Sequence, residues 1–200
     1  MRTIRYLSLI ALCFMAFNSA AAQQPTTVVA VNLKSPEFTV KELKYRVFYN
    51  QAQMKRVPLL DYDFKAALSD ELLNALAEDT RMKWRPQAEN EVIDVFGVQK
   101  NKVRLPPLEA DRVLLVSVED FGAFMVSLMP DKFYLQAKFK LIDRATGKKL
   151  WEKKLFVTEE LDGKLKELQA ENQKGLKLGV NKVLERITRK MVADLRLARI

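Results

Sequence analysis

Carboxylates are the side chains through which this 200-residue sequence can do chemistry, because other common catalytic and metal-binding types are nearly absent. There is no histidine, and the one cysteine, Cys13, lies in an apolar amino-terminal run. This composition excludes Ser-His-Asp and Cys-His nucleophiles as well as Cys/His zinc sites. The acidic residues singled out are Glu119 and Asp120, expected at the end of a central strand, and Glu159, Glu160 and Asp162, expected after a hairpin.

These carboxylates have two interpretations. Ligands of layered α/β folds often bind at strand ends, so the group is a candidate metal site or acid–base pair. The alternative, which we prefer, is ordinary turn and helix-cap chemistry. Other motifs add nothing: no serine is followed three residues later by lysine, and Thr146-Gly147-Lys148 lacks the leading glycine of a phosphate-binding loop. We therefore expect no enzyme, no metal site and no cofactor.

A second candidate site is the apolar run FGAFMVSLMP at residues 121–130. One interpretation is that the preceding strand continues through this run into the core. The other is an exposed apolar loop that binds a partner, since such patches mark interaction sites. Both remain open at this point. The contact residues in the second case are Phe121, Phe124, Met125, Leu128 and Met129.

Basic residues form a third candidate, in a chain whose formal net charge is +9. On the functional interpretation they contact an anionic lipid, a membrane surface or an acidic protein. The alternative, which we prefer, is that they are ordinary solvated faces. The residues concerned are Lys138 and Lys140 on an expected strand and Lys182, Arg186 and Arg189 on an expected helix.

The amino terminus has the pattern of a cleavable signal peptide over residues 1–22. Arg2 and Arg5 precede an apolar run of eleven residues, 7–17, and small residues end the segment at 20–22. Spanning a bilayer takes about 20 apolar residues, so we expect export rather than anchoring, and no integral membrane segment after cleavage. Leu12 precedes Cys13 where a lipoprotein signal requires a small residue, so we expect a periplasmic protein that is not a lipoprotein.

The strands and helices that must position these residues are predicted from the spacing of apolar residues along the sequence. Apolar and β-branched residues predict strands over 27–33 and 42–50, and a short strand over 81–86. An apolar stripe from Phe64 to Leu76 predicts a helix capped by Asp61 or Asp63. Residues 87–111 read as a short helix or strand inside a long connection.

The second half of the chain is easier to interpret. Residues 112–121 form a continuous apolar run that predicts a central strand covered on both faces. Alternation on either side of the turn DRATG predicts a β-hairpin over 133–157. A long helix is expected over 163–195. We therefore expect one α/β (α+β) domain, residues 23–200, with a largely antiparallel or mixed sheet covered by helices and a long carboxyl-terminal helix.

Two blocks of sequence resemble a pattern in bacterial envelope proteins. These are ADRVLLV at residues 110–116 and FKLIDRATGKKLW at residues 139–151, the second reading L-x-D-x-x-T-G-x-x-x-W. They are similar to the fold group that holds the amino-terminal domain of TolB, LpoB and CsgG. The resemblance implies a non-enzymatic adaptor or binding domain, and it supplies no catalytic residue.

Two functions from different classes remain. The first is an exported interaction or adaptor domain of the cell envelope, whose partner is an envelope protein. The second is a periplasmic carrier of a small molecule or lipid, with the loop at 121–130 as its mouth. Nucleic acid is not an expected partner of an exported chain.

Overall fold

The computed structural model describes residues 24–35, 37–45, 50–89, 91, 93, 108–126, 130–161, 165–168, 170–198 and 200. The predicted signal peptide, residues 1–22, lies outside this part, as does most of the connection 87–111. No helix among the described residues is long and apolar enough to cross a membrane. The strands are β1 (Thr26–Leu33), β2 (Phe38–Tyr45), β3 (Asn50–Val57), β4 (Lys83–Pro86), β5 (Arg112–Val126), β6 (Lys132–Asp143) and β7 (Lys149–Glu160). The helices are α2 (Phe64–Leu76), α3 (Leu165–Leu168) and α4 (Ala170–Leu197).

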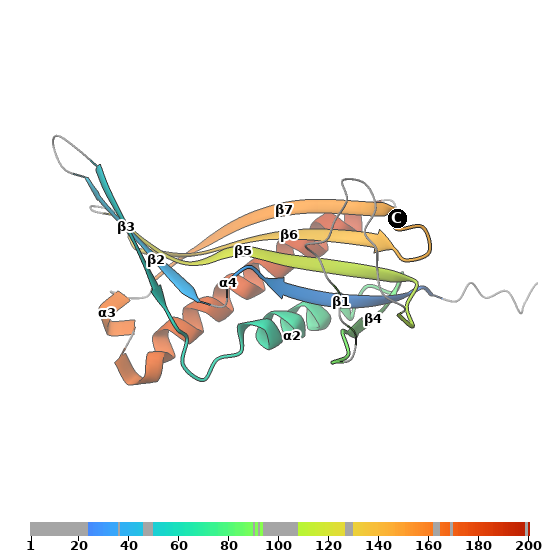
Figure 1. Cartoon of the computed structure of the whole chain (residues 1–200), viewed down its shortest axis with the longest axis horizontal. Coiled ribbons are helices and arrows are strands. Elements are labelled where there is room, and N and C mark those ends of the chain that lie inside the picture. The colour runs from blue at the N-terminus through green and yellow to red at the C-terminus, as the bar shows by residue number, and fades with distance from the viewer. Residues whose placement is uncertain are drawn as a thin grey trace, which may run out of the picture.

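The strands form one mixed, seven-stranded sheet, as the expected fold class requires (Figure 1). β5 is its central strand. On one side β5 pairs antiparallel with β6, which pairs antiparallel with β7. On its other side β5 pairs parallel with two strands in succession, β1 over residues 112–118 and β2 over residues 122–126. β4 extends the sheet beyond β1, and β3 extends it beyond β2.

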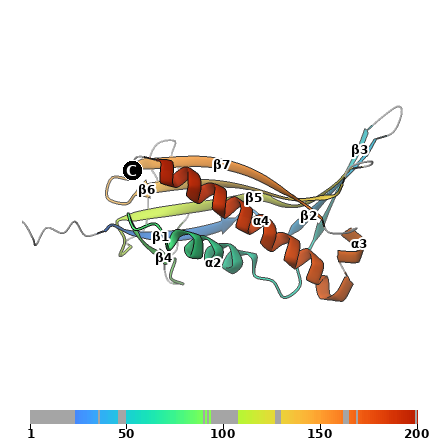
Figure 2. The ribbon, with the colours of Figure 1, turned by 180° about the vertical axis from the view of Figure 1, so that it is seen from behind.

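Both long helices cover the same face of the sheet, which Figure 2 shows from the helix side. α2 buries Phe64, Leu68, Leu72 and Leu76, the predicted stripe, and Asp63 caps it by accepting a hydrogen bond from the Ala66 amide at 2.9 Å. α4 buries a longer stripe because it has 28 residues, against 13 in α2. The buried residues of α4 include Leu176, Val180, Val183, Leu184, Ile187, Met191 and Leu195.

Among the described residues, the opposite face is covered only at one end. There Val113 and Leu115 of β5, Val28 and Ala30 of β1 and Ile142 of β6 pack with a few residues from the long connection. These are Ile93, Leu108 and Ala110. The first half of β5 is therefore buried on both faces, as expected for this central strand. We call the remainder of this side, which no described helix covers, the open face.

The β6–β7 hairpin confirms the predicted turn chemistry. Asp143 Oδ1 accepts hydrogen bonds from the Thr146 amide at 2.8 Å and from its hydroxyl at 2.6 Å. Gly147 has φ 65°, a left-handed conformation that glycine adopts without strain. The predicted helix over 163–195 is found as α3 followed by α4.

One predicted strand is wrong. Residues 42–50 do not form a single strand, because they contain the end of β2 and the first residue of β3, which pair antiparallel. β3, with the sequence NQAQMKRV, carries little of the apolar alternation that marks a strand. It lies at the edge of the sheet, where Gln53, Met54, Lys55 and Arg56 are all exposed.

Candidate functional site

The open face is interrupted where β1 ends and β2 begins. β1 ends as the Lys34 amide donates to the Val118 carbonyl at 3.0 Å. The chain then leaves the sheet before β2 resumes pairing, at Thr39 opposite Gly122. The stretch of β5 between these two pairings therefore has no parallel neighbour from β1 or β2.

A β-bulge in β5 lies at this interruption. Val118 pairs with Ala137 and Asp120 pairs with Gln136, so Glu119 is an extra residue without a counterpart on β6. A bulge shifts the alternation of a strand by one residue. Before the bulge, Val118 faces the helices, and after it Phe121 does so as well. Glu119 and Asp120 are consequently both turned to the open face.

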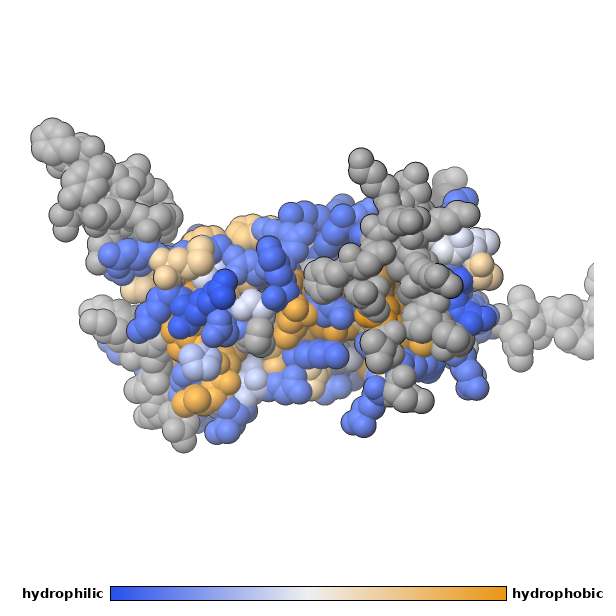
Figure 3. Space-filling view, in the orientation of Figure 1, coloured by the Kyte–Doolittle hydropathy of each residue, from blue (hydrophilic) through white to orange (hydrophobic). Residues whose placement is uncertain are grey.

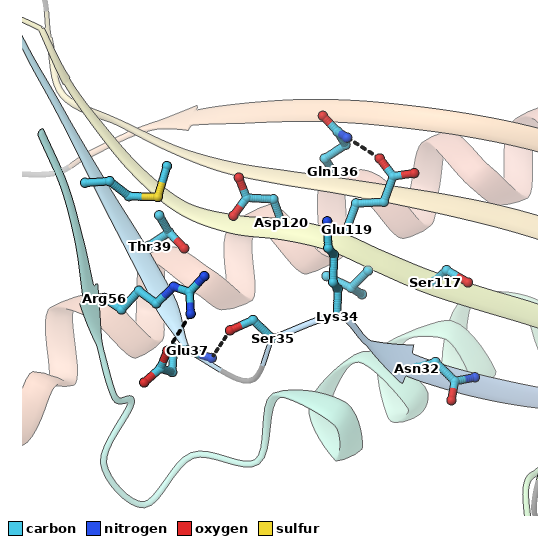
Figure 4. A pocket seen from close by; sticks show the side chains of 12 residues that line it. Asn32, Lys34, Ser35, Glu37, Thr39, Arg56, Ser117, Glu119, Asp120 and Gln136 are labelled. Carbon is cyan, nitrogen blue, oxygen red and sulfur yellow. Dashed lines mark hydrogen bonds and ion pairs between the residues drawn. The ribbon is translucent and has the colours of Figure 1, made fainter. Parts of the chain in front are cut away.

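The interruption and the bulge together create a groove of about 980 Å3 (Figure 4). β1 with the turn after it, the β2–β3 pair, and β5 with β6 each provide part of the lining. Figure 3 shows hydrophilic and hydrophobic residues side by side on this face. The residues that line the groove are Asn32, Lys34, Ser35, Glu37, Thr39, Met54, Arg56, Ser117, Val118, Glu119, Asp120 and Gln136.

The two carboxylates of the bulge are paired with cations from other strands. Glu119 lies 2.7 Å from the ammonium group of Lys154, on β7, and accepts a hydrogen bond from the Gln136 amide. Asp120 forms an ion pair with Lys41, on β2. The hydrogen bond from Lys154 is the largest factor that lowers the pKa of Glu119, despite partial burial. Glu119 is therefore an anion at neutral pH, whereas a general acid needs a raised pKa.

Three aromatic rings lie in mutual contact beside the groove, and we call them the aromatic cluster: Phe124, Tyr134 and Phe156. The ring centroids of Phe124 and Tyr134 are 4.2 Å apart, and those of Tyr134 and Phe156 are 6.2 Å apart. The Lys41 ammonium lies 4.5 Å from the centroid of Tyr134, a cation–π distance. Burial raises the pKa of Tyr134. Phe156 stays 49% exposed and offers an apolar surface to a partner.

The run at 121–130 continues β5 as far as Val126, as one of its two interpretations proposed. Phe121 is 3% exposed and stacks on Phe64 of α2, with 4.0 Å between centroids, so its ring is not available to a partner. Met125 packs against the main core. Phe124 alone of the described candidates lies on the open face. Leu128 and Met129 lie outside the described residues.

The basic candidates lie on opposite sides of the sheet. Lys138 and Lys140 are on the open face, and Lys138 pairs with Glu152 at 2.5 Å. Lys182, Arg186 and Arg189 belong to α4, on the helix side. Arg186 pairs with Glu159 at 2.5 Å, and Arg189 pairs with Glu185. The five cations therefore do not share one surface.

The acidic candidates are also separated. Glu159 binds Arg186 on the helix side, and Glu160 lies 3.8 Å from Lys132. Neither is joined to Glu119 and Asp120. Asp162 lies outside the described residues. Within the described ranges, no group of three or more acidic residues is placed to hold a metal ion.

Sequence reasoning identified Glu119 and Asp120 but missed most of the groove. Lys41 lies 79 residues from its partner Asp120, and no local pattern links them. Met54 and Arg56 were missed because β3 has no strand signal of its own. The one usable signal was the acidic pair in an otherwise apolar strand, since adjacent strand residues face opposite sides unless a bulge intervenes.

No protein-family model matches the sequence, and no curated protein matches it at a significant level. Solved structures are similar to it. Protein XCC0632 from Xanthomonas campestris, of family DUF330, is 12% identical with a TM-score of 0.54, over 86% of this chain and 85% of that one. The hypothetical protein CT253 from Chlamydia trachomatis is 14% identical with a TM-score of 0.52, over 86% and 97%. Lipoprotein GNA1162 from Neisseria meningitidis is 16% identical with a TM-score of 0.39, over 80% and 98%. The first two show a shared fold and nothing about activity.

Proposed function

We propose that this chain is an exported, non-enzymatic interaction domain of the bacterial cell envelope, and that it binds a partner protein on its open face. The observation that carries the proposal is the groove of about 980 Å3 beside a half-exposed aromatic ring. Aromatic anchors with a polar surround are the usual composition of protein interfaces. The export half of the proposal rests on the signal-peptide pattern of residues 1–22.

The charges of the groove support binding rather than catalysis. Glu119 and Asp120 are each held by a lysine, and the lowered pKa of Glu119 keeps it ionised. Acid–base pairs of hydrolases instead separate their pKa values, one raised and one low. A sample that turned over a substrate and lost that activity on Glu119→Gln would contradict the proposal.

The packing of the core favours an adaptor over a lipid carrier. The cavity between sheet and helices that Phe38, Phe64 and Phe121 line holds only about 10 Å3. Enclosed small-molecule sites usually measure about 300–1,000 Å3. The larger groove is open, and ten of the twelve residues that line it are polar or charged, which suits a protein surface better than an acyl chain. Photo-crosslinking in cells distinguishes a protein partner from a carried lipid.

The test is photo-crosslinking in living cells, with matched probe positions on the two sides of the sheet. Met54 lines the groove and is 66% exposed, and Leu178 of α4 is 57% exposed on the helix side. A probe in place of Met54 should give a discrete protein adduct that the probe in place of Leu178 does not give. A lipid adduct at Met54 would support the carrier instead. Equal labelling at both positions, or none at either, would refute the proposed surface.

A further inference from the structure

β7 is a long strand at an edge of the sheet that the described residues form. It has 12 residues, and among the described residues it pairs only with β6 (Figure 1). The amide and carbonyl groups on its other side therefore have no strand partner in the described part of the chain, and they can pair with a further strand. α4 supports β7 from the helix side through ion pairs at Lys153–Asp194, 3.2 Å, and Glu159–Arg186, 2.5 Å.

The charges of β7 change sign along the strand. Its first half carries Lys149, Lys153 and Lys154, and its last two residues are Glu159 and Glu160. The exception in the first half, Glu152, is bonded to both Lys138 and Lys149, which lowers its pKa to about 2. A strand with this polarity complements an antiparallel copy of itself, whereas a parallel copy would place like charges together.

We infer that β7 pairs antiparallel with β7 of a second copy of this chain, about a two-fold axis at Phe156. In this register Phe156 faces Phe156 of the second copy, and Leu155 faces Val157 of the second copy. The aromatic cluster then continues across the interface. Cross-strand aromatic and aliphatic pairs of this kind stabilise sheets by about 0.2–1 kcal/mol each.

The ion pairs of α4 fit the same register. Lys153 faces Glu159 of the second copy on the helix side, and their side chains are 45% and 32% exposed. With Asp194 and Arg186 they form a row of alternating sign across the interface. One pair opposes this arrangement, because Glu152 faces Glu160 of the second copy, and the two lysines that hold Glu152 reduce that repulsion.

Neighbouring registers and other edges fit less well. An axis at Val157 would place Leu155 opposite Glu159, and an axis at Leu155 would place Trp151 opposite Glu159. The β3 edge carries Lys55 and Arg56 and no acidic residue, so two copies would repel. β4 has only four residues and ends at Pro86.

The test is disulfide trapping, with Cys13 replaced by serine in every variant of the exported chain. Phe156→Cys should form covalent dimers on mild oxidation, because the two thiols lie opposite each other. Met54→Cys, at a more exposed position, should remain monomeric. A mixture of Lys154→Cys and Thr158→Cys should form more disulfide dimers than either variant alone, since these positions face each other in this register alone. Equal trapping at Met54 and Phe156, or no gain in the mixture, would overturn the inference.

Sedimentation gives an independent measurement on the cysteine-free chain. The sedimentation coefficient should rise from that of a monomer to that of a dimer as the protein concentration increases. Phe156→Glu should keep the protein monomeric, because it would place two carboxylates next to each other at the two-fold axis. Because Phe156 is half-exposed, the Phe156→Glu variant should fold normally and have the same circular dichroism spectrum as the parent protein. A monomer at all concentrations would also refute the inference. The groove experiment is unaffected, because Met54 lies on β3, far from the β7 edge in the sheet order.

Discussion

Substitution of Gly179 in α4 should be strongly destabilising, because the helix backbone lies very close to the sheet at this residue. A Cβ built on Gly179 would lie 1.9 Å from Cε2 and 2.3 Å from Cζ of Phe133 on β6. Non-bonded carbon atoms in contact keep about 3.5–4.0 Å. Phe133 cannot turn aside easily, since it is 2% exposed and packs edge-on against Phe38 with 6.0 Å between centroids. Gly179→Ala therefore forces the helix away from the sheet.

The expected cost is the difference between two effects. Alanine is favoured over glycine inside a helix by about 1 kcal/mol. Overpacking a core costs about 1–3 kcal/mol and occasionally more, and an overlap of this depth belongs at the upper end. We expect Gly179→Ala to lower the free energy of unfolding by about 2 kcal/mol, and the melting temperature by roughly 4–8 °C for a chain of this size.

Urea unfolding followed by circular dichroism measures this change. The control is Phe133→Leu, which removes the ring that the new methyl group would meet. The double variant should be less destabilised than the sum of the two single variants, with a coupling of about 1–2 kcal/mol. If Gly179→Ala proved as stable as the parent, or more stable, the close approach of α4 to β6 would be refuted.

Two further predictions concern buried polar groups near the ends of α4. Asp79→Asn should lower the free energy of unfolding by about 1–3 kcal/mol, because Arg81 loses its buried counter-charge. In the parent protein Arg81 donates hydrogen bonds to Asp79 at 2.7 Å and to the Leu195 carbonyl at 3.1 Å. The hydrogen bond from Arg81 lowers the pKa of the Asp79 carboxyl below 3.8, so the stability that it contributes is present above this pH and is lost as the pH falls below it. In urea titrations the free energies of unfolding of the parent and of Asp79→Asn should therefore become equal in acid. Gln173→Ala should cost about 1–2 kcal/mol, since the Gln173 amide accepts from Leu60 N at 2.9 Å and donates to the Pro58 carbonyl at 3.1 Å, and hydrogen exchange should accelerate at Leu60 first. Unchanged exchange at Leu60 would count against this role.

Local chemistry explains what the sequence determined by itself. The α2 helix follows from a stripe at helical spacing and from Asp63, whose partner Ala66 is three residues away. The hairpin follows from Asp143 and Gly147, which set the turn within five residues. Both interactions join residues that are close in the sequence, so the local sequence pattern alone predicts them.

The β3 strand and the candidate groove depended on tertiary structure. β3 is a strand because β2 offers it hydrogen bonds at the sheet edge, although its own residues are largely polar. Glu119 and Asp120 were visible as an acidic pair, but the bulge that turns both to one face exists only because β6 pairs around it. Lys41 and Lys154, which hold these carboxylates, come from strands that are distant in the sequence. Strand pairing decides which distant residues meet, and the free energy of that pairing belongs to the whole sheet rather than to any one segment.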